Sequence, residues 1–164
     1  MKAYFAGGCF WCVTPIYQLY GVEKVTCGYC GGDEENPSYD DVKAQKTGHR
    51  ETIMLDYDPK VVDYDLLLDI YFENIDPYDG GGQFIDRGFS YSPAIFYVTE
   101  EERQKAEAYM RGLQEKTGRV PAVSLEPYKK FWPAEEEHQD YYLKNPEEFE
   151  EELLKSGRKK QEIS

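Results

Sequence analysis

The sequence predicts a single α+β domain, a two-layer plait with a ferredoxin-like core, a mixed sheet with packed helices and an irregular C-terminal region. At 164 residues the chain can bury a core without disulfides or a metal. Short β-prone runs and helical patterns follow one another in the order β-α-β-β-α-β-α-β. Because no internal repeat or low-complexity linker interrupts this order, we expect residues 1–164 to form one domain, in which 151–164 is a C-terminal tail.

The first half of the chain predicts two strands separated by a helix. Gly7 and Gly8 interrupt the first β-prone run, and the apolar residues that follow recur at helical spacing. The expected elements are a strand at 2–6, a helix at 9–19 closed by Gly21, and a strand at 22–27 that ends in a glycine-rich turn at 28–33.

The second half begins with an alternating strand at 50–57, in which Ile53, Leu55 and Tyr57 share one face of the pleat with Glu51. A 20-residue loop follows later in the chain, and loops of that length in a compact domain are usually functional or disordered. The remaining expected elements are a helix at 63–72, the loop at 74–93, a strand at 94–98, a helix at 100–116 capped by Thr99 and Glu102, a strand at 120–125 and a solvent-facing helical region from 133.

Charge and hydropathy exclude several classes of partner. The formal net charge of −13 argues against a nucleic-acid partner, because binding to a phosphate backbone requires clustered Lys and Arg. No basic, apolar leader and no apolar stretch of membrane-spanning length is present. We therefore expect a cytoplasmic protein without a membrane partner, in a compartment that keeps thiols mostly reduced. We also expect a monomer.

Cys9 is a candidate nucleophile from its position alone. A cysteine in the first turn of a helix lies near unpaired backbone N–H groups and the positive end of the helix dipole, which favour the thiolate. Gly7 and Gly8 allow the backbone to approach a ligand closely at the same place. Phe10 and Trp11 follow directly, and two large rings here are either core residues or the apolar lining of a pocket.

The four cysteines also permit a metal site. Cys9 and Cys12 are separated by 14 residues from a second pair, Cys27 and Cys30, which is close to zinc-ribbon spacing. A zinc-binding structural or interaction module is therefore the alternative function. Against it, the first pair has the spacing of one helix rather than of a tight turn, so we expect no metal.

The cysteines leave several disulfides open. Cys12 lies three residues from Cys9, and each CxxC pair, or a pair formed across the two motifs, could close a redox disulfide. A general thioredoxin-like disulfide reductase is a further reading of a CxxC motif at a helix start.

Glu51 is a candidate general acid. If its strand face is the buried one, desolvation raises the pKa of the carboxyl group and leaves a proton available near neutral pH. A strand-end carboxylate pointing into water is the alternative.

Eight segments, spread over about residues 3–150, resemble in order the peptide methionine sulfoxide reductase A family. They are Gly7-Gly8-Cys9-Phe10-Trp11, Gly28-Tyr29-x-Gly31-Gly32, Asn36-Pro37-x-Tyr39, Thr47-Gly48-His49-x-Glu51, Tyr57-Asp58-Pro59, Asp76-Pro77, Gly82-Gln83-x-x-Asp86-x-Gly88 and Ala134-Glu135-x-x-His138-Gln139.

The resemblance implies one catalytic domain that reduces methionine S-sulfoxide, free or peptide-bound, to methionine. In the family the cysteine of GCFW attacks the sulfoxide sulfur and becomes a sulfenic acid, which is the first step of the cysteine oxidation ladder. A disulfide then forms and thioredoxin, or another dithiol, reduces it. No cofactor is implied, and the partners implied are oxidised proteins or free methionine sulfoxide and a thioredoxin-like reductant.

The resemblance also implies roles for individual residues. Glu51 matches the acid that protonates the sulfoxide oxygen, and Tyr39 and Tyr91 match tyrosines that donate hydrogen bonds to it. The substrate-binding positions that match are Phe10 and Trp11, which contact the methyl group, and Asp86 and His138.

Two features depart from the family pattern. Many members read Gln-Tyr-Arg-Ser where this chain has Ser90-Tyr91-Ser92-Pro93, so Tyr91 keeps neither polar neighbour. Many members carry resolving cysteines in a C-terminal tail, whereas residues 155–164 contain none. The resolving thiol is then expected to be Cys30, which lies in a glycine-rich turn. Cys12 is the second choice, because a disulfide between positions i and i+3 is awkward within an intact helix, and Cys27 is the third. Direct reduction by an external reductant is the alternative.

Overall fold

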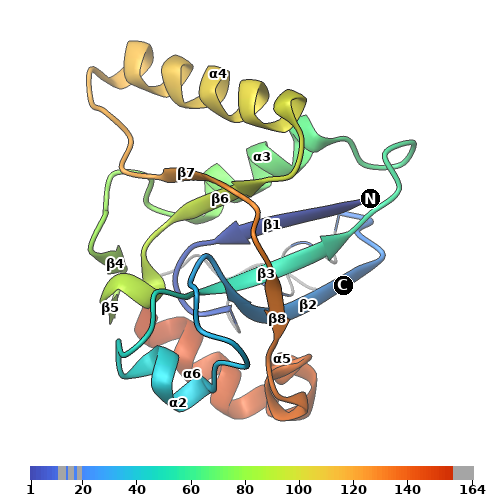
Figure 1. The fold of residues 1–164 in the computed structure, drawn as a ribbon, viewed down its shortest axis with the longest axis vertical. Helices are drawn as coiled ribbons and strands as arrows, with labels where there is room; N and C mark the ends of the chain where they lie inside the picture. The colour runs from blue at the N-terminus through green and yellow to red at the C-terminus, as the bar shows by residue number, and fades with distance from the viewer. Residues whose placement is uncertain (11–13, 15–16, 18–19, 157–164) are drawn as a thin grey trace.

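The computed structural model of the chain describes residues 1–10, 14, 17 and 20–156 (Figure 1). Its sheet contains six strands in the order β7-β6-β1-β3-β2-β8. All neighbouring strands pair antiparallel except β6 and β7, which are parallel, so the sheet is mixed as the sequence predicts. The strands are β1 Lys2–Ala6, β2 Lys24–Cys30, β3 Arg50–Asp56, β6 Ala94–Tyr97, β7 Ser124–Pro127 and β8 Phe131–Pro133, and a separate pair is β4 Gly82–Gln83 with β5 Asp86–Arg87.

The helices described with full bounds lie mostly where the hydrophobic pattern predicts them. They are α2 Tyr39–Lys43, α3 Tyr64–Asn74, α4 Glu100–Thr117, α5 Tyr141–Lys144 and α6 Pro146–Ser156, with the 3₁₀ turns η1 Phe89–Tyr91 and η2 Glu136–His138. The Thr99 hydroxyl accepts the Glu102 N–H at the start of α4, and Gly118 ends this helix in the left-handed conformation. No helix among these described segments is long and apolar enough to cross a bilayer.

Helix α3 and the sheet enclose the larger core. Leu67, Leu68 and Tyr71 of α3 pack with strand residues such as Phe5 and Ile53, and α4 stacks on α3 through the Phe72 and Tyr109 rings, 4.5 Å apart. Phe10, Thr14 and Tyr17 are helical, as the pattern after Gly8 predicts.

The segment that joins β7 to β8 covers the opposite face of the sheet. It runs from one sheet edge to the other, as Figure 1 shows, because β7 pairs with β6 and β8 pairs with β2. Its Tyr128 ring stacks on Tyr4 at 4.4 Å, and Phe131 packs beside it. The two faces therefore have separate cores.

The prediction for the second strand is wrong at both ends. β2 spans residues 24–30 and pairs with β3 over its whole length, so residues 28–30 are strand rather than turn. Gly28 is needed for a close approach: a Cβ atom there would lie 2.3 Å from the Phe131 ring and 2.4 Å from the Trp132 carbonyl oxygen. The turn begins at Gly31, whose φ is 98°.

Two further expectations are corrected. The last strand lies at 124–127 instead of 120–125, and the chain then adds β8. The loop at 74–93 is structured, because it contains β4, β5 and η1, and Gln83 exchanges hydrogen bonds with the backbone of Asp76 at 2.6 and 2.8 Å. Of the two expectations for this long loop, functional or disordered, the second is therefore wrong.

Candidate active site

Glu51 lies on the buried face of β3. It is 1% exposed, and Ile53, Leu55 and Tyr57 on the same face belong to the larger core. Oε1 accepts the Phe10 N–H at 3.3 Å, whereas Oε2 has no hydrogen-bond partner within ordinary distance among the described residues. Burial raises the pKa of Glu51 to about 8, and the Phe10 N–H and Tyr91 oppose this increase only in part. At neutral pH the group is a carboxylic acid.

Cys9 directly precedes the helical residue Phe10, and its side chain is buried at 8% exposure. Gly8 has a φ of 85°, and its N–H donates to the Tyr91 carbonyl at 3.0 Å. The N–H of Phe10, the residue after Cys9, donates to Glu51. The short turn that carries the Cys9 thiol is therefore hydrogen-bonded to both Tyr91 and Glu51.

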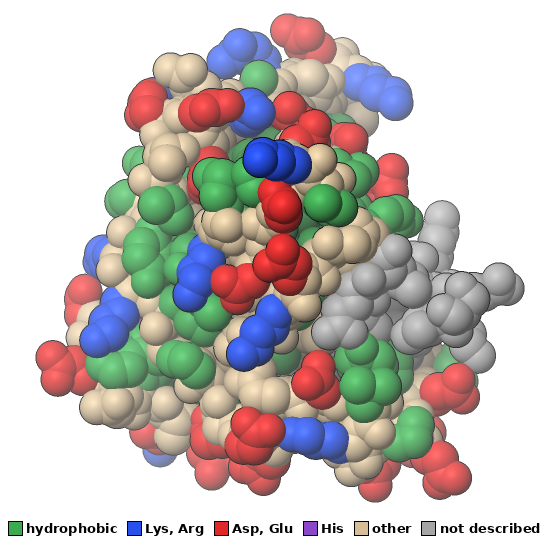
Figure 2. Space-filling view, turned by 90° about the vertical axis from the view of Figure 1, so that its right-hand side faces the viewer, with side chains coloured by type: hydrophobic (Ala, Val, Ile, Leu, Met, Phe, Trp, Pro, Cys, Tyr) green, Lys and Arg blue, Asp and Glu red, His purple; other side chains and the backbone are tan. Residues whose placement is uncertain are grey.

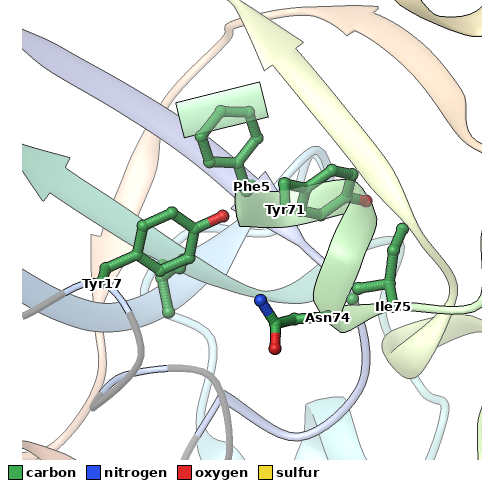
Figure 3. Close-up of a pocket in the computed structure, with 7 residues that line it drawn as sticks. Phe5, Tyr17, Tyr71, Asn74 and Ile75 are labelled. Carbon is green, nitrogen blue, oxygen red and sulfur yellow. The ribbon is translucent and has the colours of Figure 1, made fainter. Parts of the chain in front are cut away.

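Helix α3 and Ile75, the residue that follows it, contact the residues just before Cys9. The Tyr71 hydroxyl donates to the Ala6 carbonyl at 2.6 Å, and Gly7 lies against Ile75, where a Cβ atom would be 2.7 Å from Cγ2. Figure 3 shows the residues that line a cavity at this place, with Tyr17 on the left and Tyr71 and Ile75 on the right. At about 10 Å³ it can hold no more than one water molecule, so it is not a substrate site.

Aromatic rings from three segments meet beside the turn. The Tyr39 ring at the start of α2 lies 4.1 Å from the His138 ring, and Phe10 lies 6.1 Å from Tyr39 and 5.8 Å from His138. Such rings suit a thioether or methyl sulfoxide group, because sulfur contacts with aromatic edges are favourable. Burial lowers the pKa of His138, although nearby carboxylates oppose this decrease. The lowered pKa favours the neutral imidazole.

Tyr91 and Asp86 complete the group. Tyr91 ends η1 and is buried, and its pKa is raised first by burial and then by Glu51, Tyr39, Cys9 and Asp86. Asp86 lies in β5 and also raises the pKa of Glu51. The structure thus brings together Cys9, Phe10, Tyr39, Glu51, Asp86, Tyr91 and His138, whereas Trp11 and Cys12 lie outside the described residues.

The segment 134–139 contributes residues to which sequence reasoning gave no role. The carboxylate of Glu135 accepts the Tyr29 hydroxyl at 2.9 Å and the Tyr39 N–H at 3.2 Å. The Gln139 amide accepts the Cys27 N–H at 2.8 Å and donates to the Cys27 carbonyl at 2.9 Å, as a paired strand would. The resembling motif contains Glu135 and Gln139, but their spacing alone does not reveal their partners.

Cys27 and Cys30 lie on opposite faces of β2. Cys27 packs in the larger core, within 3.3 Å of the Thr14 hydroxyl, and Cys30 packs with Tyr4 and Phe131 on the other face. Burial raises the pKa of each thiol to about 12. Because both sulfurs cannot bind one ion from opposite faces, the zinc-module alternative is not supported.

One group of potential metal ligands is found among the described residues. Side-chain donors of Glu135, Glu137 and His138 lie within 4.8 Å of one another. Glu135 already accepts two hydrogen bonds there, and the His138 ring packs against the Tyr39 ring at an angle of 37°. We therefore interpret these three residues as structural parts of the site rather than as metal ligands.

The site defines a class of protein: a thiol oxidoreductase with a cysteine at the start of a helix and a buried carboxylic acid beside it. A family model described as peptide methionine sulfoxide reductase matches residues 1–164. "Peptide methionine sulfoxide reductase MsrA" of Halalkalibacterium halodurans is 48% identical over 161 residues, which cover 96% of this chain and 91% of that protein. "Peptide methionine sulfoxide reductase MsrA 2" of Staphylococcus aureus is 45% identical over 160 residues, covering 96% and 90%.

Solved structures agree with these relatives. Mxr1 from Saccharomyces cerevisiae in reduced form aligns with a TM-score of 0.83 at 31% identity, over 89% of this chain and 86% of that one. Methionine sulfoxide reductase A of Corynebacterium diphtheriae aligns with a TM-score of 0.76 at 29% identity, over 88% and 74%. The chain belongs to the peptide methionine sulfoxide reductase family.

The burial of Glu51 predicts a stability that depends on pH. Between pH 5 and 8 the folded chain keeps the Glu51 proton and the unfolded chain releases it, so this group lowers the free energy of unfolding by up to about 1.4 kcal/mol per pH unit as pH rises. In Glu51→Gln this contribution disappears, and the slope of the free energy against pH becomes more positive by that amount. Urea unfolding at several pH values measures it, with Glu115→Gln on the exposed face of α4 as the control. Equal slopes in the wild type and Glu51→Gln would contradict the buried acid.

Proposed function

We propose that this member of the family reduces methionine S-sulfoxide, free and peptide-bound, with Cys9 as the nucleophile and Glu51 as the acid. The buried, protonated Glu51 carboxyl, whose Oε1 accepts the N–H of the residue after Cys9, carries the proposal. Its Oε2 has no hydrogen-bond partner among the described residues, and the substrate oxygen is proposed to become that partner. Tyr39 and Tyr91 are proposed to donate to the same oxygen.

The reaction moves one oxygen atom between two sulfur atoms. The Cys9 thiolate forms a bond to the sulfoxide sulfur while Glu51 gives its proton to the sulfoxide oxygen, which removes the negative charge from that atom. The S–O bond of the substrate and the new bond between the two sulfur atoms then break as the oxygen passes to Cys9, so methionine leaves with a reduced sulfur and Cys9 becomes a sulfenic acid. Phe10, Trp11 and His138 are proposed to contact the substrate methyl group and side chain, and Asp86 the polar part of the methionine unit.

A second thiol completes the cycle. It condenses with the sulfenic acid, releases water and forms a disulfide, which a dithiol reductant returns to two thiols. A solved structure of yeast Mxr1 in complex with Trx2 shares the fold at 22% identity, and it supports a thioredoxin-type protein as the reductant here. No prosthetic group is part of the proposed cycle.

Further features belong to the same proposal. We infer one catalytic domain, 1–164, that acts as a monomer in the cytoplasm. A plait with a ferredoxin-like core is supported by the central strands β6-β1-β3-β2, which stand in the order fourth, first, third, second among these four and are all antiparallel. On the face shown in Figure 2, Lys and Arg side chains lie singly among carboxylates and form no basic patch. We therefore propose no nucleic-acid partner.

The nucleophile is tested with separated epimers of a methionine sulfoxide peptide and dithiothreitol. We expect the wild type to reduce the S epimer and not the R epimer, and Cys9→Ser to reduce neither, because the alcohol cannot accept the oxygen. Cys27→Ser is the matched control, since that thiol is buried and outside the reacting group. Turnover by Cys9→Ser, or equal turnover of both epimers, would contradict the proposal.

The second thiol is proposed to be Cys12. Cys30, the first choice from the sequence, is fully buried on the sheet face opposite Glu51, and both Cys27 and Cys30 are held as thiols by a raised pKa. Thiolate is the attacking form, so these two are poor candidates in this conformation.

Peptide mapping after one equivalent of substrate, without reductant, tests this assignment. We expect a Cys9–Cys12 disulfide in the wild type, in Cys27→Ser and in Cys30→Ser, and a persistent sulfenic acid, trapped by dimedone, in Cys12→Ser. A disulfide that joins Cys9 to Cys27 or Cys30 in the wild type would reject Cys12.

A further inference from the structure

The η1 turn contributes to the site twice. The Tyr91 side chain interacts with the Glu51 carboxyl, and the Tyr91 carbonyl accepts the N–H of Gly8 at 3.0 Å, one residue before Cys9. The position of this three-residue turn therefore sets both the tyrosine and the turn that carries the nucleophile. The two residues beside Tyr91, Ser90 and Ser92, are among the three that depart from the Gln-Tyr-Arg-Ser pattern.

Gln45 holds the residue before Tyr91. Its Nε2 donates to the Ser90 hydroxyl at 2.8 Å, and its Oε1 accepts the Ser90 N–H at 2.9 Å. Gly88 allows this approach, because a Cβ atom there would lie 2.8 Å from the Gln45 amide carbon. Gln45 follows α2, the helix that begins with Tyr39, so the amide links the segments that carry the two site tyrosines.

Arg50 holds the residue after Tyr91. Its Nε donates to the Ser92 hydroxyl at 2.8 Å, and that hydroxyl donates to the Phe89 carbonyl at 2.6 Å. The guanidinium also lies 4.3 Å from the centre of the Phe89 ring. Arg50 therefore contacts both ends of the turn in which Tyr91 lies.

Glu126 fixes the guanidinium in place. Nη1 of Arg50 donates to Glu126 Oε2 at 2.6 Å, and the same oxygen accepts the Ser124 hydroxyl at 2.8 Å. The arginine is 6% exposed, and it precedes Glu51 in β3, so the two side chains leave the strand on opposite faces. The end of one strand thus contacts η1 through two consecutive residues.

We propose that Gln45 and Arg50 are positioning residues that hold Tyr91 against Glu51 and hold Gly8 in the nucleophile turn. The functional part of this inference rests on the proposed function, since it assigns Tyr91 to the substrate oxygen. Neither residue needs to touch the substrate. In this chain, two hydrogen-bonded serines and their partners from other elements fix the tyrosine where the family pattern has larger polar neighbours.

A double-mutant cycle tests the functional part. Arg50→Lys keeps the charge opposite Glu126 but loses the planar fork and the Nε contact, and Gln45→Ala removes the amide without adding charge. In single-turnover reduction of the S-sulfoxide peptide, we expect each variant to slow sulfenic-acid formation by roughly tenfold. In a Tyr91→Phe background we expect less than about twofold further loss, because the positioned hydroxyl is already absent. Equal losses in both backgrounds would show a general structural effect and overturn the proposal.

A second readout does not depend on activity. Hydrogen exchange at the Gly8 amide, which donates to the Tyr91 carbonyl, should accelerate by about tenfold in Arg50→Lys and Gln45→Ala. The matched control is Arg103→Lys, whose guanidinium pairs with Glu100 and Glu107 on α4 and should leave both measurements unchanged. Unchanged Gly8 exchange in both site variants would overturn the positioning role, whereas a wild type inactive on the S-sulfoxide would reject the proposed function instead.

Discussion

The arrangement of the site depends on one constraint, the burial of the Glu51 carboxyl in the sheet without a countercharge at hydrogen-bond distance among the described residues. Removing a carboxylate from water is costly, so the group keeps its proton and becomes an acid at neutral pH. Nearby Asp86 increases this effect, whereas the Phe10 N–H and Tyr91 reduce it. Burial of Glu51 therefore lowers the stability of the fold at this position and leaves a protonated carboxyl group there at neutral pH.

Elements far apart in the sequence keep that acid next to Cys9. The Tyr71 hydroxyl supports β1 before the nucleophile turn, and the Tyr91 carbonyl holds Gly8 within it. From the other side, Glu135 holds the start of α2 through the Tyr39 N–H, and Gln139 pairs with the β2 edge at Cys27. These hydrogen bonds order the long loop and the C-terminal segment around the short turn at residues 7–10.

The sequence predicted those parts of the site that depend on local pattern. A two-residue period placed Glu51 with Ile53 and Leu55, and a helical period after Gly8 placed Cys9 at a helix start. The contacts of Arg50 with Ser92 and of Gln45 with Ser90 join residues 42 and 45 positions apart, and no periodicity carries that information. Gly28 was interpreted as a turn residue from the glycines around it. The actual reason for a glycine there is the Phe131 ring, which excludes a side chain and comes from a strand far away in the sequence, so the local pattern does not reveal it.

The pH dependence of sulfenic-acid formation tests the account most directly. In single-turnover reactions of the wild type, the rate constant should fall as pH rises through about 8, because the Glu51 proton is lost there. In Glu51→Gln the rate at neutral pH should be much lower and this decline should be absent. A decline near pH 8 that persists in Glu51→Gln, or a wild-type rate that stays constant to pH 9.5, would contradict the assignment of Glu51 as the buried acid.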